Sequence, residues 1–102
     1  MFQIHPLPDE NGPAFACEGE FTIYAVADAR RELEALQDAH PKLVLDLQEV
    51  QEIDSAGVQL LLWLKRRAGN AGRDLVLERV SRAVADVLDL LQVAEAFGAL
   101  EA

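Results

Sequence analysis

A short apolar segment between two helical patterns constrains the fold of this chain most. Residues 43–47 read Leu-Val-Leu-Asp-Leu, the length and composition of a strand buried on both faces. Helical patterns flank it, an amphipathic one over residues 25–38 and an apolar one over 55–68. A buried strand between two helices is typical of a parallel sheet with crossover connections. The sequence therefore predicts an α/β protein.

The remaining segments complete this architecture. Three further strands are predicted from β-rich runs over residues 2–4, 14–18 and 74–79. Residues 6–13 are rich in turn-forming residues, Ser81 caps a last amphipathic helix, and residues 93–98 add a helical turn. The predicted order is β-β-α-β-α-β-α, a mixed, largely parallel sheet of four to five strands with three to four helices. A chain of 102 residues holds one core, so residues 1–102 are expected to form one domain.

The charge balance argues against several classes of function. The formal net charge is −9 and the pI is about 4.5. A nucleic-acid binder needs a basic patch, and unassisted docking on an anionic membrane needs basic residues too. The sequence shows neither a signal peptide nor a run approaching the roughly 20 apolar residues of a membrane span. We therefore expect a soluble, cytoplasmic protein.

The residue types that most often carry catalysis or metal binding occur here in sequence contexts that favour structural roles. Cys17 is the sole cysteine and lies in an apolar run, which favours a small core residue over a nucleophile. His5 and His40 are far apart and next to prolines, as turn residues are. Asp46 lies inside a strand and lacks the companions of a receiver-type phosphoacceptor, so a contact with a neighbouring loop is expected. No Walker, Gly-x-Gly-x-x-Gly or Gly-x-Ser-x-Gly motif occurs, and we expect no cofactor, no metal and no enzymatic activity.

A small polar pair, Asp54-Ser55, stands where the apolar helix begins, after a connecting segment over residues 48–53. Asp and Ser are preferred helix caps, while the free N–H groups and dipole of a helix start favour an anion. The pair is thus either a plain helix start or a hydroxyl placed to carry a phosphate. Ala56 and Gly57 are small enough to leave the Ser55 hydroxyl accessible to a kinase, and Asp54 could bind a proton or Mg²⁺ during phosphoryl transfer.

The apolar helix has two distinct faces. Its better core face comprises Leu60, Leu61, Leu64 and Ala68. A second face comprises Gln59, Trp63, Arg66 and Arg67. Trp63 is either a buried core residue or, partly exposed beside arginine, an anchor for a partner protein. Gln59, Trp63 and Arg66 are therefore candidate partner-binding residues.

In order along the chain, several segments resemble the STAS domain of bacterial anti-sigma factor antagonists. Residues 43–47 are similar to the central strand of that family, and residues 53–62 to its phosphorylation loop and second helix. Residues 80–84 resemble its Ser-Pro-Ala-Val helix start, with Arg82 where proline is usual. Residues 18–24 are most similar to small stand-alone STAS proteins of chemotaxis and two-component systems.

The resemblance implies a non-enzymatic, phosphorylation-gated switch in bacterial signal transduction. Ser55 would be the phosphoacceptor of an anti-sigma-type serine kinase, with Asp54 as its acidic neighbour. The unphosphorylated form would bind that kinase or another signalling regulator, and a phosphatase would reset the cycle. Phosphoserine adds about −1.5 to −2 charge, which a helix N-terminus tolerates but a binding interface does not.

Two other functions stay open. Some STAS proteins are constitutive cytoplasmic subunits of an ABC-type phospholipid transport complex and bind its ATPase. An enzyme with Ser55 as nucleophile is the third hypothesis, although the base and oxyanion motifs are missing. The sequence does not specify the partner, the pathway or the oligomeric state.

Overall fold

The fold is built on one sheet. A computed structural model describes residues 1–8 and 13–98, and in these residues four strands pair in the order β1-β2-β3-β4. Their bounds are β1 (Phe2–Leu7), β2 (Ala14–Phe21), β3 (Lys42–Ile53) and β4 (Asp74–Glu78). β1 is antiparallel to β2, whereas β2, β3 and β4 are parallel to one another. The predicted mixed, largely parallel sheet is confirmed.

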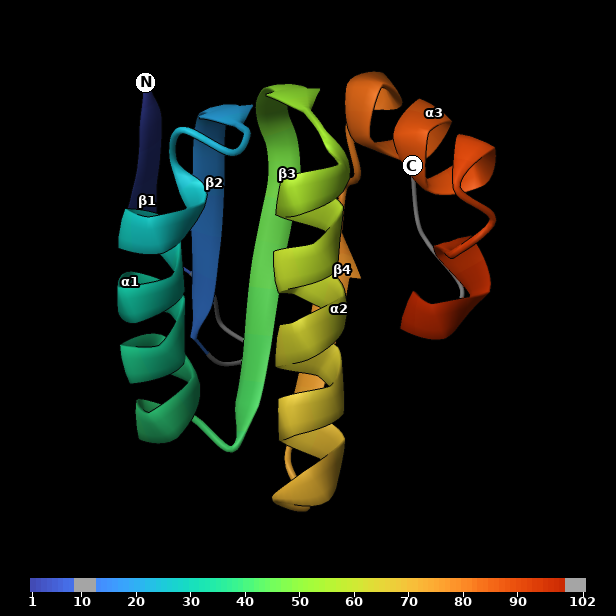
Figure 1. The fold of residues 1–102 in the computed structure, drawn as a ribbon. Helices are drawn as coiled ribbons and strands as arrows, with labels where there is room; N and C mark the ends of the chain where they lie inside the picture. Colours follow the sequence, from blue (N-terminus) through green and yellow to red (C-terminus); the bar gives the residue numbers. More distant parts are fainter. Residues whose placement is uncertain (9–12, 99–102) are drawn as a thin grey trace.

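Helices cover one face and one end of this sheet. Within the described ranges they are α1 (Val26–Ala39), α2 (Ser55–Asn70), α3 (Arg82–Leu90) and a 3₁₀ turn, η1 (Ala94–Phe97). α1 and α2 lie side by side in front of the sheet, and α3 lies at the right of the view, where it contacts β3 (Figure 1). Ser81 caps α3, since its hydroxyl accepts a hydrogen bond from the Val84 N–H. The predicted order β-β-α-β-α-β-α is confirmed.

β3 is much longer than predicted. Residues 48–53 were expected to connect the strand to the next helix, but β3 continues to Ile53. The continuation pairs with β2, where Gly19 faces Val50 and Phe21 faces Ile53. β4 ends earlier, and on that side the Ser81 hydroxyl donates to the Val50 carbonyl at 2.8 Å. The polar side chains of residues 48–53 suggested a loop. The sequence does not show that β2 on one side and Ser81 on the other supply hydrogen-bond partners for the backbone of this segment.

The first two strands also extend beyond their predicted ends. β1 continues through Pro6. An edge strand tolerates proline because it pairs on one side only, so a missing N–H on its open side leaves no neighbouring strand without a donor. β2 passes through Gly19, whose φ is +100° and where a Cβ would lie 1.8 Å from the Met1 carbonyl oxygen. Of the predicted turn over residues 6–13, residues 9–12 lie outside the described residues.

Two groups predicted to be structural are found in the interior. Cys17 is fully buried, and burial, assisted by the carboxylates of Asp46 and Glu32, raises the pKa of its thiol to about 12. Asp46 is also buried, and its carboxylate accepts a hydrogen bond from Arg79 Nε at 2.8 Å. Arg79 directly follows β4, so the predicted contact of Asp46 with a neighbouring loop is confirmed.

Candidate functional site

Asp54 caps α2 and joins it to a second segment of the chain. Its backbone is extended, with φ −116° and ψ −176°, and its Oδ1 accepts a hydrogen bond from the Gly57 N–H at 3.0 Å. Its Oδ2 accepts a second one from the Ile23 N–H at 2.9 Å. Ile23 lies in the loop between β2 and α1. One carboxylate therefore fixes the start of α2 against the loop that precedes α1.

The charge state of Asp54 follows from these contacts. Partial burial acts to raise the pKa of Asp54, but the backbone N–H groups of Ile23 and Gly57 outweigh it and hold the pKa below 3.8. The carboxylate is thus ionised near neutral pH. Of the two roles considered for Asp54 in phosphoryl transfer, holding a proton is disfavoured, because both oxygens already accept hydrogen bonds from the backbone.

Gly57 is required to be small by the packing at the start of α2. It is buried, and a Cβ there would lie 2.3 Å from the carbonyl oxygen of Phe21 and 2.9 Å from Cγ1 of Ile53. Real Cβ atoms do not approach other atoms so closely. Gly57 therefore lets α2 start against the end of β2. This packing role is additional to the predicted one, in which its small size leaves the Ser55 hydroxyl accessible.

Ser55 is the first residue of α2 and is exposed. The pair does form a helix start, as one of the two interpretations predicts, and the capping residue is Asp54 rather than Ser55. Among the described residues no hydrogen bond engages the Ser55 hydroxyl. The fold therefore leaves this hydroxyl at a helix N-terminus, facing solvent.

A groove between α1 and α2 collects the three residues predicted to bind a partner. Its lining comprises Val26, Ala27, Arg30, Ala56, Gln59, Leu60, Trp63 and Arg66. Trp63 is half-buried and packs on the core, so it serves the core and lines the groove at once. The guanidinium carbon of Arg30 lies 4.3 Å from the centroid of the Trp63 ring, the geometry of a cation–π contact.

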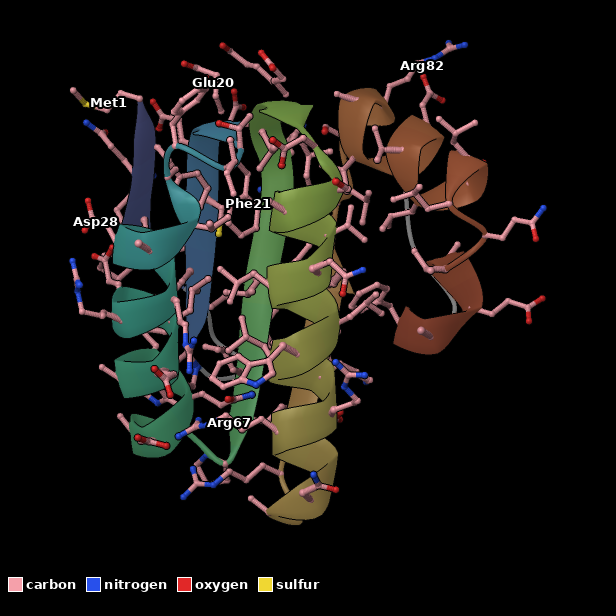
Figure 2. All side chains as sticks on the ribbon, viewed as in Figure 1. Met1, Glu20, Phe21, Asp28, Arg67 and Arg82 are labelled. Carbon is pink, nitrogen blue, oxygen red and sulfur yellow. The ribbon has the colours of Figure 1, made fainter. Side chains whose placement is uncertain are left out.

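Arg67 lies beside Trp63, as the sequence predicts, with its guanidinium carbon 5.8 Å from the ring centroid, and it also reaches across to α1. Its Nη1 donates to Gln37 Oε1 at 2.7 Å and its Nη2 to Asp38 Oδ1 at 2.8 Å. Gln37 is buried and donates in turn to the Leu64 carbonyl at 2.8 Å. Figure 2 shows Arg67 between the two helices, where it holds α1 to α2.

Sequence reasoning missed three residues of this surface. Ile23 and Tyr24 are 59% and 96% exposed in the loop that Asp54 holds. Their signal in the sequence is an apolar pair directly before the helix predicted over residues 25–38. Arg30 gave no signal, because nothing in the sequence places it over Trp63.

The two histidines lie in β1 and directly after α1. In β1, His5 pairs with Ala16, and His40 ends α1 at the end of the molecule away from Ser55 (Figure 1). In residues 1–8 and 13–98 no three His, Cys, Asp or Glu side chains are grouped to hold a metal ion. Over the same residues, no helix combines the length and the apolar character that crossing a membrane requires.

Comparison with known proteins identifies the family. The family described as "Mlab, STAS domain" matches residues 9–100. Solved structures with the same fold include the anti-sigma factor antagonist SpoIIAA in its unphosphorylated form, at 19% identity and TM-score 0.73, covering 100% of this chain and 89% of that one. An anti-sigma factor antagonist from Mycobacterium paratuberculosis shares 22% identity at TM-score 0.74, covering 96% and 85%. SpoIIAA of Bacillus in its phosphorylated form shares 18% at TM-score 0.68, covering 100% and 92%.

These structural relatives establish the fold alone. Their sequence identities to this chain are too low to transfer a function. No curated protein matches the chain significantly. The family match nevertheless spans most of the sequence, and the element order and sheet topology agree with it. The chain therefore belongs to the STAS domain family.

Proposed function

We propose that this protein is a phosphorylation-gated binding switch in bacterial signal transduction. Unphosphorylated, it binds a serine kinase of the anti-sigma type or another signalling regulator. Phosphorylation of Ser55 releases that partner, and a phosphatase restores binding. The protein catalyses no reaction itself in this proposal, and Ser55 is the modified residue rather than a nucleophile.

The observation that carries the proposal is the division of labour between Asp54 and Ser55. Asp54 supplies the capping interactions with both carboxylate oxygens, so the exposed Ser55 hydroxyl is not required by the fold. A phosphate on Ser55 would sit at a helix N-terminus, where N–H groups and the helix dipole favour an anion. SpoIIAA, with the same fold, has been solved in both phosphorylated and unphosphorylated forms. Both forms of SpoIIAA share the fold of this chain, which supports a switch that works without a change of fold.

The surface around Ser55 supplies a reason for the partner to be lost. Ser55 stands between Asp54, which binds the loop of exposed Ile23 and Tyr24, and Ala56, which lines the groove. A partner covering both features would bury the Ser55 position. Removing a phosphoserine dianion from water at such an interface is unfavourable unless the partner supplies cations for it.

The test is recovery of the partner by variants of Ser55 in the native host. Tagged wild type, Ser55→Ala, Ser55→Asp and Ser55→Asn are expressed, and co-purifying proteins are quantified by mass spectrometry. We expect a kinase-like protein with wild type and Ser55→Ala, roughly tenfold depleted with Ser55→Asp. Ser55→Asn matches aspartate in size without its charge, so it should bind well. Phosphate on Ser55 of the wild type is expected in the same experiment.

Equal recovery of that partner by the Asp and Asn variants would refute gating by charge.

A constitutive subunit of an ABC-type phospholipid transport complex is the second candidate, and it is kept because the matching family is described by MlaB rather than by a sigma-factor regulator. It predicts stoichiometric recovery of an ATPase by all four proteins, with no phosphate on Ser55.

A further inference from the structure

The groove between α1 and α2 differs in charge from the rest of the molecule. The chain has 18 acidic and 9 basic residues and a formal net charge of −9. The described residues that line the groove include two arginines, Arg30 and Arg66, and no carboxylate. A partner whose charge complemented the acidic molecule as a whole would therefore be mismatched at this groove.

The two arginines are available to different degrees. Arg30 lies over the Trp63 ring, and its Nε is 3.6 Å from Glu34 Oε2 in a partly exposed pair, which is a weak interaction. Arg66 is exposed, and none of the ion pairs among the described residues involves it. Apolar atoms of Val26, Leu60 and the Trp63 indole complete the lining. The groove thus combines an apolar floor with a free guanidinium at its edge.

From this pairing we infer that the groove binds an acidic segment of the partner protein. An apolar side chain of that segment lies on Trp63 and Leu60, and a neighbouring carboxylate pairs with Arg66, assisted by Arg30. Guanidinium groups bind carboxylates through two parallel hydrogen bonds, and Trp and Arg are the side chains most often dominant in interfaces. The inference deepens the proposed function, since it names the chemistry of the partner at the same surface.

An acidic occupant also explains why phosphorylation of Ser55 would lower the affinity for the partner rather than raise it. Ser55 precedes Ala56, which lines the end of the groove nearest the start of α2. A phosphate there places about −1.5 to −2 charge at the edge of a site that holds a carboxylate. Arg66 lies 11 residues (66 − 55) further along α2, about 16 Å from Ser55, so the phosphate acts on the part of the bound acidic segment that lies near Ala56, where like charges repel. Phosphorylation therefore weakens binding without any change of fold.

The experiment selects peptides with a displayed library of random linear sequences. The baits are wild type, Arg66→Glu, and Arg82→Glu as a matched charge-reversal control. Arg82 is 92% exposed on α3, away from the α1–α2 groove (Figure 2). Wild type and Arg82→Glu should select an apolar residue next to Asp or Glu, and Arg66→Glu should select Lys or Arg there instead.

Affinities of the selected peptides are then measured by the fluorescence of Trp63, which is the only tryptophan in the chain and lies in the groove. Replacing the selected Glu by Gln, or Arg66 by Glu, should weaken binding roughly tenfold. Circular dichroism confirms that each variant is folded. Selection without acidic enrichment, failure to select any peptide, or equal affinity of wild type and Arg66→Glu would overturn the inference.

The Ser55 variants separate this inference from the proposed function. If acidic peptides bind through Arg66 but Ser55→Asp and Ser55→Asn bind them equally, the groove inference stands and the phosphate gate fails. If recovery of the cellular partner depends on charge at Ser55 but the selected peptides are not acidic, the gate stands and the groove inference fails.

Discussion

Asp54 is the residue on which the geometry of the site depends. Its two oxygens bind N–H groups of Ile23 and Gly57, which are 34 residues apart (57 − 23). The site is therefore not a local helix cap alone but a junction between the β2–α1 loop and α2. The exposed apolar residues of that loop keep their position relative to Ser55 because Asp54 accepts both hydrogen bonds.

Replacing Asp54 by Asn should reveal this junction as a pH-dependent contribution to stability. An amide offers one acceptor oxygen for two N–H groups, so the free energy of unfolding should fall by about 1 to 2 kcal/mol at neutral pH. The pKa of Asp54 is lower folded than its ordinary 3.8. Its stabilisation is thus present above that value and is lost as the pH falls through the folded pKa.

Urea unfolding of wild type and Asp54→Asn at neutral and acidic pH measures the effect. The difference between the two proteins should shrink as the pH drops below about 4. Asp89→Asn, at an exposed position on α3, is the control and should change stability little at either pH. A difference for Asp54→Asn that is independent of pH would contradict the role of the ionised carboxylate.

At the scale of elements, two contacts define the binding surface. The start of α2 packs on the end of β2 at Gly57, and the far half of α2 is held to α1 by Gln37 and Arg67. Because Arg30 belongs to α1 and Trp63 to α2, their stacking depends on how these helices sit together. The groove is consequently a property of the helix pair and not of either helix alone.

The two ends of α2 should respond oppositely to the same substitution. Gly57→Ala places a Cβ against the Phe21 carbonyl and should lower the free energy of unfolding by about 1 to 3 kcal/mol. Gly69 lies in the same helix, and apart from its chain neighbours and the adjacent helix backbone, no atom lies within 4 Å of the position that its Cβ would occupy. Gly69→Ala should raise the free energy of unfolding by roughly 0.5 to 1 kcal/mol. Thermal and urea unfolding measure both, and a change of the same sign at both positions would refute the packing role of Gly57.

The whole molecule has one core that reaches most of its elements. The buried cluster includes Phe21 of β2, Leu33 of α1, Leu45 of β3, Leu61 of α2 and Leu88 of α3. Phe97 of η1 belongs to it as well. No group of elements in the described chain has an apolar core of its own. Loss of one helix would therefore expose apolar side chains of the elements that pack against it.

Unfolding should therefore be a single cooperative transition. Trp63 reports the α1–α2 layer and far-ultraviolet circular dichroism reports the secondary structure as a whole, and both should give one midpoint in urea. A Trp63 transition that precedes the loss of circular dichroism would show that the helical layer opens by itself. In that case the groove would not be the rigid site that the stacking of Arg30 indicates.

Local sequence patterns are sufficient to predict the α/β class, the element order and the position of Asp54-Ser55 at the start of the second helix. These features rest on local signals: the apolar run from Leu43 to Leu47, helical spacing, and capping residues such as Ser81. Such signals act between residues a few positions apart. They can therefore be interpreted without knowing what lies beside each element, and the structure confirms them.

The contacts of each site residue depend on how distant segments pack in three dimensions. β3 continues to Ile53 because β2 and Ser81 supply backbone partners, and Gly57 is needed because Phe21 lies against it. Arg30 reaches Trp63 from a different helix. Each of these contacts joins residues about 30 or more positions apart, and a one-dimensional pattern does not encode which distant residues meet. Phosphorylation of Ser55 stays a prediction, because the fold provides the exposed hydroxyl while a partner must supply the chemistry.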